Sequence, residues 1–398
     1  MRLLFLSLYF HPARRYGGPI VSTAQLCRGL AARGFEVRAL TTNADGPDRL
    51  DVPAGWREAG ENLRIRYCRR LGLGDRFGEL FAPGLLAVLP RQVARADAVY
   101  VWGILVWPLP VLTVLCRLFG KPLVISPRGM VFPEALATKG GRKRLFLAVL
   151  RRIAGARVVY HVTSEEEARA VREIFPGART IEVPNGVEVP AEVPSPEVGR
   201  PYLLFLGRIH PHKQIERILS AFAAYARWAR SLGGEPPADL VLAGSGDESY
   251  QRSLEQAAAQ EGIAPWVRFL AHVEGADKAR LLAGAEGLIL ASKSENFGLS
   301  VAEALAHGTP CVVTRTAPWS GLERERCGFW VEDGTEPLAE GIGRLMTLSP
   351  GERRAWGARG RAWMIRDFSQ EGVADRMAAA LTDLTRSSSL AWASRHAG

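Results

Sequence analysis

At 398 residues, 47% of them hydrophobic, the chain is long enough for two domains with separate cores, and it has no low-complexity segment or short repeat. Its five cysteines stand singly, without the spacing of a disulfide framework or a zinc site, which favours a reducing compartment such as the cytoplasm. The net charge of +10 resides in the first half, because residues 1–190 hold 28 Lys/Arg against 16 Asp/Glu. No recognised nucleic-acid-binding motif accompanies this charge, so a nucleic-acid partner is not expected.

The opening stretch MRLLFLSLYFHPARR is predicted to be a buried strand. Its apolar part is only about eight residues long and no small-residue cleavage site follows, which argues against a signal peptide. In the turn after it, Gly17 and Gly18 precede Pro19, a residue that suits the first position of a helix. Such a glycine pair permits a ligand to approach the backbone closely, although a simple turn is the commoner use.

The segment Ala98–Cys116 carries no charge and approaches membrane-spanning length. Pro108 and Pro110 interrupt it, so a strand over Ala98–Trp102, a loop and a helix that starts near the prolines explain it better.

The segment Lys139–Arg157, KGGRKRLFLAVLRRIAGAR, predicts a basic amphipathic helix, and no acid occurs from Ala135 to Ser164. Two interpretations stay open: a helix that lies on an anionic membrane, or a core helix with a solvated basic face. Just after it, Ser164 and Glu167 have the spacing of a capping box, which we assign to helix stability.

Both halves of the chain alternate apolar runs with helical stretches, which is typical of a parallel sheet covered by helices. The proline-rich segment Val183–Pro201 predicts a linker. We therefore expect an α/β protein with two doubly wound, Rossmann-like domains and a cleft between them. The predicted division is a first domain at 1–183, a linker at 184–201, a second domain at 202–366, and at 367–398 a C-terminal helix and tail that cross back to the first domain.

The first turn of the second half reads FLGRIHPHKQIERIL. Arg208 and Lys213 bracket a loop before a helix that is predicted to begin near Gln214. Two cations beside a helix start look like a diphosphate clamp, since the free amides there bind anions. His210 and His212 lack partners at metal-ligand spacing, so we interpret them as loop residues. The post-strand loop AGSGDE, Ala243–Glu248, is a weaker candidate for a ligand-lining segment.

The stretch SENFGLSVAEALAHGTPCVVT places Glu295 in a loop and Glu303 about one turn inside a helix. The two carboxylates flank the free amides of the helix start. That arrangement suits a ligand with both phosphate and sugar hydroxyls, although most Glu pairs at such spacing are ordinary loop and surface acids.

This stretch resembles the E-x7-E signature of retaining glycosyltransferases of family 4, which have the GT-B fold. GRIHPHK resembles the phosphate-binding loop of that family, and SPRGMVFPEAL, Ser126–Leu136, resembles a segment of members that build bacterial surface polysaccharides. The resemblance runs through nearly the whole chain.

The resemblance implies a role for each motif residue. Arg208 and Lys213 would hold the donor diphosphate, Glu303 the ribose hydroxyls and Glu295 the transferred sugar, which makes Arg208, Lys213 and Glu295 the expected catalytic residues. Further donor contacts are expected from Val273, by its main chain, and from Gly17, Gly18, Phe297, Gly298, Leu299 and Ser300. Trp102 and Arg128 are expected on the acceptor side. No metal or other cofactor is expected, because the resemblance implies enzymes that need no metal, and the sequence has no DxD motif; the nucleotide-diphosphate sugar is the co-substrate.

Two residues depart from the family pattern. Trp102 stands where many relatives carry an active-site histidine, and Gln214 replaces the usual glycine after the clamp lysine. The first departure bears on acceptor chemistry more than on donor binding.

The resulting expectation is a metal-independent, retaining hexosyltransferase of cell-surface polysaccharide biosynthesis. It would act on a hydroxyl of a lipid-linked or polysaccharide acceptor, in the cytoplasm and at the inner face of the plasma membrane. The alternatives are a pseudoenzyme that binds nucleotide or glycan as an assembly partner, which Trp102 motivates, and a sugar-nucleotide epimerase of the same fold.

Overall fold

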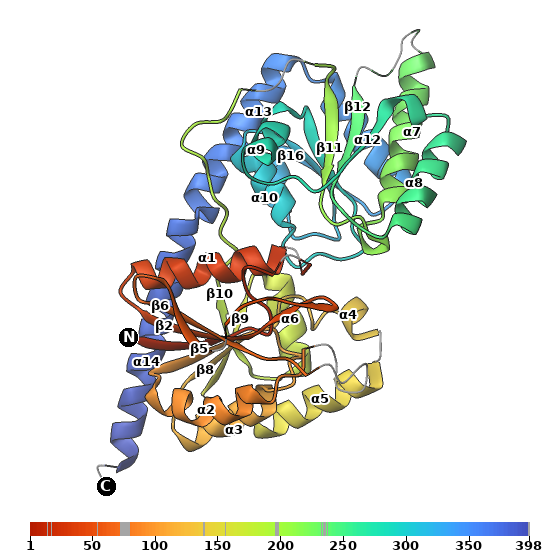
Figure 1. Ribbon diagram of the computed structural model, residues 1–398. Helices are drawn as coiled ribbons and strands as arrows, with labels where there is room; N and C mark the ends of the chain where they lie inside the picture. Colours follow the sequence, from red (N-terminus) through yellow and green to blue (C-terminus); the bar gives the residue numbers. More distant parts are fainter. Residues whose placement is uncertain are drawn as a thin grey trace. The chain divides into compact units, whose positions relative to one another are not determined.

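The computed structural model describes residues 1–13, 15–16, 18–53, 55–71, 80–137, 140–155, 157–195, 199–231, 233, 236 and 238–396 (Figure 1). The described chain forms two compact units, which are treated separately below. Unit 1 comprises Met1–Gly186 with Gln370–Gly398, and unit 2 comprises Val187–Ser369.

Unit 1 is built on one sheet with the strand order β10-β9-β8-β7-β1-β2-β6-β5. Adjacent strands of this sheet are parallel, except β5 and β6, which form an antiparallel pair at one edge. The strands are β1 Arg2–Leu6, β2 Glu36–Thr42, β5 Gly55–Gly60, β6 Leu63–Cys68, β7 Ala98–Trp102, β8 Leu123–Ser126, β9 Val158–Val162 and β10 Arg179–Glu182, beside the small pair β3 Ala44–Asp45 and β4 Asp48–Arg49. The helices are α1 Gly18–Ala32, α2 Gly84–Arg95, α3 Leu109–Leu118, α4 Pro133–Ala137, α5 Gly140–Ile153, α6 Glu165–Ile174 and α14 Gln370–His396.

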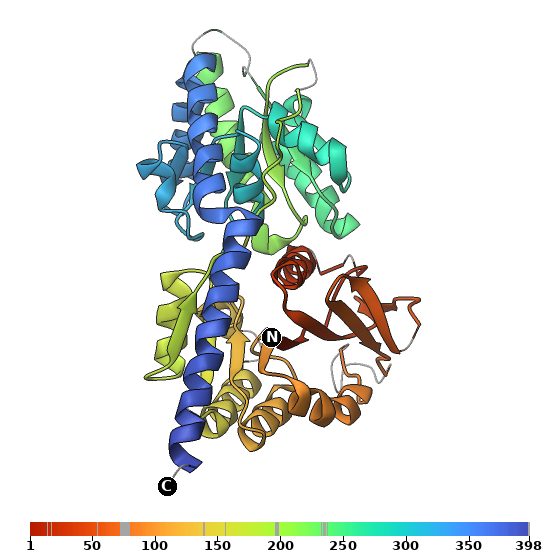
Figure 2. The same cartoon turned by 90° about the vertical axis from the view of Figure 1, so that its left-hand side faces the viewer.

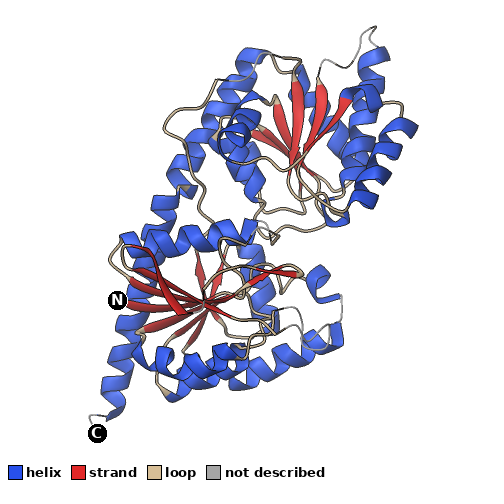
Figure 3. Cartoon of the chain, in the orientation of Figure 1, coloured by secondary structure: helices blue, strands red, loops and turns tan. Residues whose placement is uncertain are grey.

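Alternate residues of the strands in unit 1 face two separate cores, because successive side chains of a strand point to opposite faces. Leu4 and Leu6 of β1 belong to a core with α2, α3 and α5, whereas Leu3 and Phe5 belong to a core with α1 and α14. Figures 1 and 3 show the sheet between these two helix layers. Strands buried on both faces explain why the sequence reads as continuous apolar runs.

The last helix belongs to unit 1 (Figure 2). On α14, Val373, Met377 and Leu381 join the core formed with α1. The two helices approach so closely that a Cβ on Gly29 would lie 2.7 Å from the Cβ of Ala374. Arg33, which directly follows α1, also donates from Nε to Asp375 Oδ1, at 2.6 Å. Helix α14 is therefore an integral layer of the first unit.

Unit 2 is an all-parallel sheet with the order β13-β12-β11-β14-β15-β16. Its strands are β11 Tyr202–Leu206, β12 Asp239–Ala243, β13 Val267–Leu270, β14 Gly287–Leu290, β15 Cys311–Thr314 and β16 Gly328–Val331. Its helices are α7 Ile215–Ser231, α8 Glu248–Gln260, α9 Gly275–Gly284, α10 Leu299–Ala306, α11 Gly321–Arg324, α12 Thr335–Thr347 and α13 Pro350–Trp363, with short 3₁₀ turns η2 Pro211–Lys213 and η3 Ala264–Trp266 and a π-helical turn η4 Met364–Phe368. The α/β prediction with two parallel-sheet domains is confirmed.

The helix that was predicted to begin near Gln214 starts at Ile215 as α7, which confirms that prediction. Lys213 ends the 3₁₀ turn η2, and Gln214 adopts a left-handed conformation (φ 48°) before the helix. The predicted capping box of α6 is confirmed only in part. The Ser164 hydroxyl does cap α6 by accepting from Glu167 N, at 3.3 Å. The Glu167 carboxylate, however, binds elsewhere, as described below.

Candidate active site

In unit 2, the loop after β11 and the loop after β14 bring two of the predicted residues into contact. Lys213 Nζ donates to Glu295 Oε1 in an ion pair, and Ser292 Oγ donates to the same oxygen at 2.8 Å. Both side chains are mostly buried, with 22% of Lys213 and 13% of Glu295 exposed. The Glu295 carboxylate thus binds the ammonium group that was predicted to hold a diphosphate.

The backbone holds these two loops together as well. Lys293 N donates to His212 O at 2.9 Å, and His212 Nε2 donates to Ser294 O at 2.7 Å. His212 is therefore a structural link between the loops, consistent with its interpretation as a loop residue.

Glu295 leads into the helix start that the sequence singled out. Gly298, the N-cap of α10, has φ 78°, which strains any other residue, and a Cβ there would crowd Leu290 Cδ2 at 3.1 Å and Trp319 Nε1 at 3.2 Å. The buried Trp319 donates from Nε1 to Phe297 O and packs against the Phe297 ring. Leu299 and Ser300 open the helix, where amides have no intrahelical acceptor. Trp319 therefore fixes the position of a potential anion-binding helix start.

The second glutamate of the motif has a partner that sequence reasoning missed. Lys278 of α9 donates from Nζ to Glu303 Oε1 at 2.6 Å, and 30% of the Lys278 side chain and 17% of the Glu303 side chain are exposed. Nothing local marks Lys278, because the contact arises from the packing of α9 beside α10. With Oε1 bound to an ammonium group, the Glu303 carboxylate has one preferred orientation and its Oε2 stays available for hydroxyl groups.

The loop around Arg208 is electropositive. The pKa of His210 lies below its usual value because burial disfavours the imidazolium, and the charges of Arg208, His212 and Lys213 act in the same direction. Arg208 is exposed, and its guanidinium makes no hydrogen bond to any residue that the structure describes. Val273, half-buried, lies in the connection between β13 and α9.

The glycine-rich loop after β12 supports the predicted phosphate loop. Gly207 N donates to Ala243 O at 3.0 Å, and Ile209 N donates to Ser245 O at 2.9 Å. A Cβ on Gly246 would lie 1.9 Å from Ile209 O, so only glycine permits this contact. The glycines of AGSGDE are thus explained by backbone packing against residues 207–209.

In unit 1, the structure joins the two predicted acceptor-side residues. Trp102 ends β7 and is buried, and the guanidinium carbon of Arg128 lies 3.5 Å from the centroid of its ring. Arg128 also donates to Asn185 Oδ1 and, at 3.2 Å, to Tyr100 Oη. Cation–π stacking at this distance, away from water, stabilises the pair.

Glu167 fixes the Arg128 loop. Its fully buried carboxylate accepts from Gly129 N at 2.6 Å and from Thr163 N at 2.9 Å. Arg128 itself has φ 56°, a backbone conformation that costs energy for a residue other than glycine. Burial raises the pKa of Glu167, although these amide donors oppose the shift. Sequence reasoning assigned Glu167 to helix capping alone, because its long-range partner Gly129 is invisible locally.

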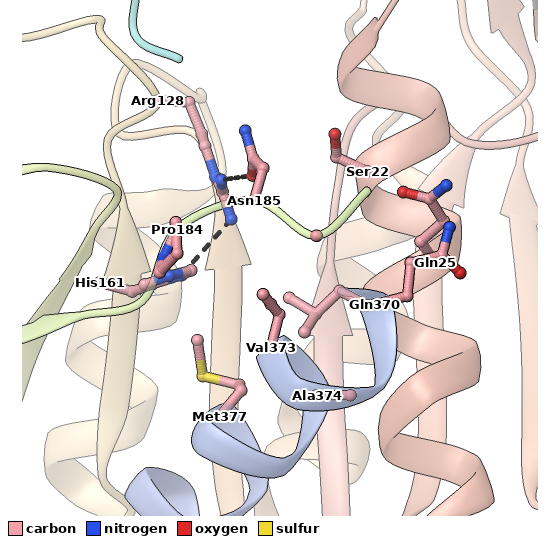
Figure 4. Close-up of a pocket in the computed structure, with 12 residues that line it drawn as sticks. Ser22, Gln25, Arg128, His161, Pro184, Asn185, Gln370, Val373, Ala374 and Met377 are labelled. Carbon is pink, nitrogen blue, oxygen red and sulfur yellow. Dashed lines mark hydrogen bonds between the residues drawn. The ribbon is translucent and has the colours of Figure 1, made fainter. Parts of the chain in front are cut away.

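A second missed residue is His161, the last residue but one of β9. Its Nε2 donates to Val183 O at 2.8 Å, and its Nδ1 accepts from Tyr100 Oη at 2.6 Å. Burial, together with the Arg128 charge, holds the pKa of His161 well below its usual value, so the ring is neutral. Figure 4 shows His161, Arg128 and Asn185 along one side of a pocket in unit 1, opposite Ser22 and Gln25 of α1. An imidazole thus lies next to Arg128 of the Trp102–Arg128 pair, but on β9, which β8 separates from β7.

Gly18 begins α1, whereas Gly17 and Lys139 lie outside the described residues. All five cysteines are buried free thiols. Within the described ranges, no cluster of three or more His, Cys, Asp or Glu side chains is arranged to hold a metal ion. The described helices also include none that is both long and apolar enough to cross a membrane.

Two family models match the chain in succession. Residues 17–186 match the "Glycosyl transferase 4-like domain", and residues 191–363 match "Glycosyl transferases group 1". The chain is 26% identical over 334 residues to a GDP-mannose:cellobiosyl-diphosphopolyprenol alpha-mannosyltransferase of Xanthomonas oryzae pv. oryzae, covering 82% of this chain and 81% of the relative.

Solved structures share the fold over nearly the full length. A sucrose-phosphate synthase from Thermosynechococcus elongatus has a TM-score of 0.73 at 21% identity, covering 97% of this chain and 99% of the other. Anabaena HepE in complex with UDP and glucose has a TM-score of 0.71 at 18% identity, covering 96% and 100%.

The GT-B class of protein is defined by two units of this kind, each with a parallel sheet and with candidate ligand-binding loops at the carboxyl ends of its strands. The chain belongs to the glycosyltransferases of this class, of the family 4 type.

Proposed function

We propose that the protein transfers a hexose from a nucleotide-diphosphate sugar to a hydroxyl of a lipid-linked or polysaccharide acceptor, with retention of the anomeric configuration, in cell-surface polysaccharide biosynthesis. The main support for donor binding in this proposal is the Lys213–Glu295–Ser292 cluster beside the start of α10. The named Xanthomonas relative, which uses GDP-mannose and a diphosphopolyprenol, supports the acceptor class.

The donor diphosphate would take the place of Glu295 on the Lys213 ammonium group. Arg208 and the free amides of Leu299 and Ser300 would supply further donors to its oxygens. Glu295, released from Lys213, would accept hydroxyl groups of the hexose, and Glu303 would accept those of the ribose. These cations and amides suffice to bind a diphosphate, which is our reason for proposing transfer without a metal.

In the transfer step, the bond between the anomeric carbon and the diphosphate oxygen breaks, and the acceptor oxygen bonds to that carbon on the same face. The acceptor proton passes to the departing diphosphate. Lys213 and Arg208 would stabilise the negative charge that develops on the leaving group, where fixed cations lower the barrier most. No side chain of unit 1 has to act as a base, so Trp102 in place of a histidine is compatible with transfer.

A panel of UDP- and GDP-hexoses tests the proposal through nucleotide release, with and without a short-chain prenyl-diphosphate saccharide, in buffer containing EDTA. We expect one donor to release nucleotide, faster with acceptor, and an α-linked donor to yield an α-linked product by NMR. The stacked Trp102–Arg128 pair favours a second candidate, a nucleotide- or glycan-binding pseudoenzyme. Binding without release would support that candidate, and an isomerised donor would indicate an epimerase.

The protein is further proposed to work at the inner face of an anionic membrane, because a diphosphate-linked lipid would be presented there. The exposed basic side chains of α5 support this part of the proposal.

A further inference from the structure

The helix layer formed by α2, α3 and α5 carries no acidic residue. The three helices hold eight basic residues: Arg91, Arg95, Arg117, Arg142, Lys143, Arg144, Arg151 and Arg152. They cover the same face of the sheet, with α3 packed between α2 and α5 (Figure 1). Because their inner sides are in the core, their outer sides all face away from the sheet. The outer faces of these three helices therefore carry charges of a single sign.

Exposed apolar side chains gather on the same layer. Of the twelve large apolar side chains that are exposed in the described part of the chain, seven lie on it: Leu86, Val111, Val114, Leu118, Phe119, Leu145 and Val149. Leu118 is 74% exposed and Leu145 is 68% exposed, the two highest values among the twelve. A monomeric protein rarely gathers so many exposed apolar side chains without a partner.

The spacing of these residues explains how one surface combines both features. Val111, Val114 and Leu118 recur at helical intervals on the outer side of α3, and Arg117 lies beside them. On α5, Leu145 and Val149 are one turn apart, with Arg142 and Arg152 one turn before and after them. Apolar groups can enter the acyl region of a bilayer while the neighbouring cations remain among the head groups.

We propose that the outer face of α2, α3 and α5 is a docking surface for an anionic phospholipid bilayer, with Leu118, Phe119 and Leu145 as its inserting groups. This surface would bring unit 1 to a lipid-linked acceptor. Its biological role therefore rests on the proposed function, whereas the membrane binding itself does not. The occupant is a membrane and not an acidic protein, because exposed apolar side chains alternate with basic ones over three helices, as a bilayer with an acyl region beneath anionic head groups requires. The absence of acids from all three helices matches a surface of uniformly negative head groups.

Vesicle sedimentation tests the surface with the full-length protein. Liposomes of phosphatidylcholine alone are compared with liposomes that also contain phosphatidylglycerol, at low and high salt. The apolar variant is Leu118→Ser with Leu145→Ser, and the charge variant is Arg142→Glu with Arg152→Glu; all four side chains are exposed, so folding should persist by circular dichroism. Matched controls in unit 2 are Trp228→Ser with Ile365→Ser and Arg252→Glu with Arg354→Glu.

We expect the wild type and both controls to bind anionic vesicles, and both test variants to bind about ten-fold more weakly or worse. High salt should weaken the wild type and abolish the difference between the charge variant and its control, since screening acts on charges alone. The apolar variant should remain weaker than its control at every salt concentration.

Equal vesicle binding by the apolar variant and the wild type would overturn the proposal. It would also be overturned if the control variants in unit 2 lost as much vesicle binding as the test variants. Light scattering without lipid provides a further check: a dimer that the apolar variant converts to monomer would assign the surface to a second copy of the chain. Nucleotide release in solution separates the two proposals. Its absence in a wild-type protein that still binds vesicles would refute the transferase proposal and leave the docking surface intact.

Discussion

Nζ of Lys278 lies 2.6 Å from Oε1 of Glu303, although the two residues belong to different helices of unit 2. This pair holds the Glu303 carboxylate, which we propose binds the ribose, in one orientation. Lys278→Met should weaken nucleoside-diphosphate binding several-fold, because the Glu303 side chain would lose its preferred orientation. Lys278→Arg should restore most of the affinity. Calorimetry measures both variants.

The sign of this effect decides between two roles for Lys278. If Lys278 competes with the ribose for Glu303, Lys278→Met should tighten binding, and the positioning role would be wrong. A double-mutant cycle with Glu303→Gln supplies the second measurement: residues that act together give non-additive losses, whereas additive losses would make Lys278 a bystander.

Replacing Glu303 by Gln removes the charge but keeps one carbonyl oxygen for the ribose. The expected loss of nucleoside-diphosphate affinity is roughly 1.5 to 3 kcal/mol, the range for a hydrogen bond to a charged group. The loss should vanish when a 2′,3′-dideoxynucleotide is titrated, since the hydroxyl partners are then missing from the ligand. Glu340→Gln, at an exposed position of α12, is the control. An equal loss with both nucleotides would contradict the ribose assignment.

Lys213→Ala should lower turnover by about 10²-fold or more, by analogy with removing one anion-stabilising donor. Thermal unfolding should show some loss of stability but not of folding, because the mostly buried Glu295 carboxylate loses its cation and keeps the Ser292 hydroxyl as a donor. Lys293→Ala, which removes an exposed cation from the adjoining loop, is the matched control. Normal turnover in Lys213→Ala would exclude this lysine from the mechanism.

Glu167→Gln should destabilise unit 1 by roughly 1 to 3 kcal/mol near neutral pH, because an amide nitrogen would face one of the backbone donors of Gly129 and Thr163. Burial raises the pKa of Glu167 in the folded state, so the folded chain holds its proton more tightly than the unfolded chain. The stability gained from this proton is complete below the unfolded pKa, about 4.3, and is lost as pH rises through the higher folded pKa.

Urea unfolding over a series of pH values tests this sign. The wild type should lose stability in that window relative to Glu167→Gln, which cannot titrate there. A wild type that gains stability relative to the variant as pH rises would show that the amide donors, and not burial, dominate the environment of this carboxyl group.

The sequence predicts the parts of the fold whose burial leaves an apolar pattern. The central strands, such as β7 and β14, appear as short apolar runs because helices cover both of their faces. The edge pair β5–β6 was not predicted, since β5 reads GWREAG and is largely exposed. β16, at the edge of the second sheet, was also missed.

Prediction of the candidate site from the sequence is limited in the same way. Motif residues such as Lys213 and Glu295 could be named from their spacing, whereas Lys278 and Glu167 acquire their partners only when distant segments pack together. Glu167 was assigned to a local cap because its sequence neighbours satisfy that pattern. Long-range contacts of this kind leave no periodic signal in the chain.

The membership of α14 in unit 1 has a consequence for biosynthesis. The ribosome translates residues 187–369 before it makes α14, the helix that packs against Gly29 and the core around Leu30. The half of the protein that is translated first is consequently the half that is finished last, and the nascent chain carries an open apolar face throughout synthesis of the second half. Termination of translation just before Gln370 would yield a complete unit 2 attached to an unfinished unit 1, a product suited to recognition by chaperones and proteases.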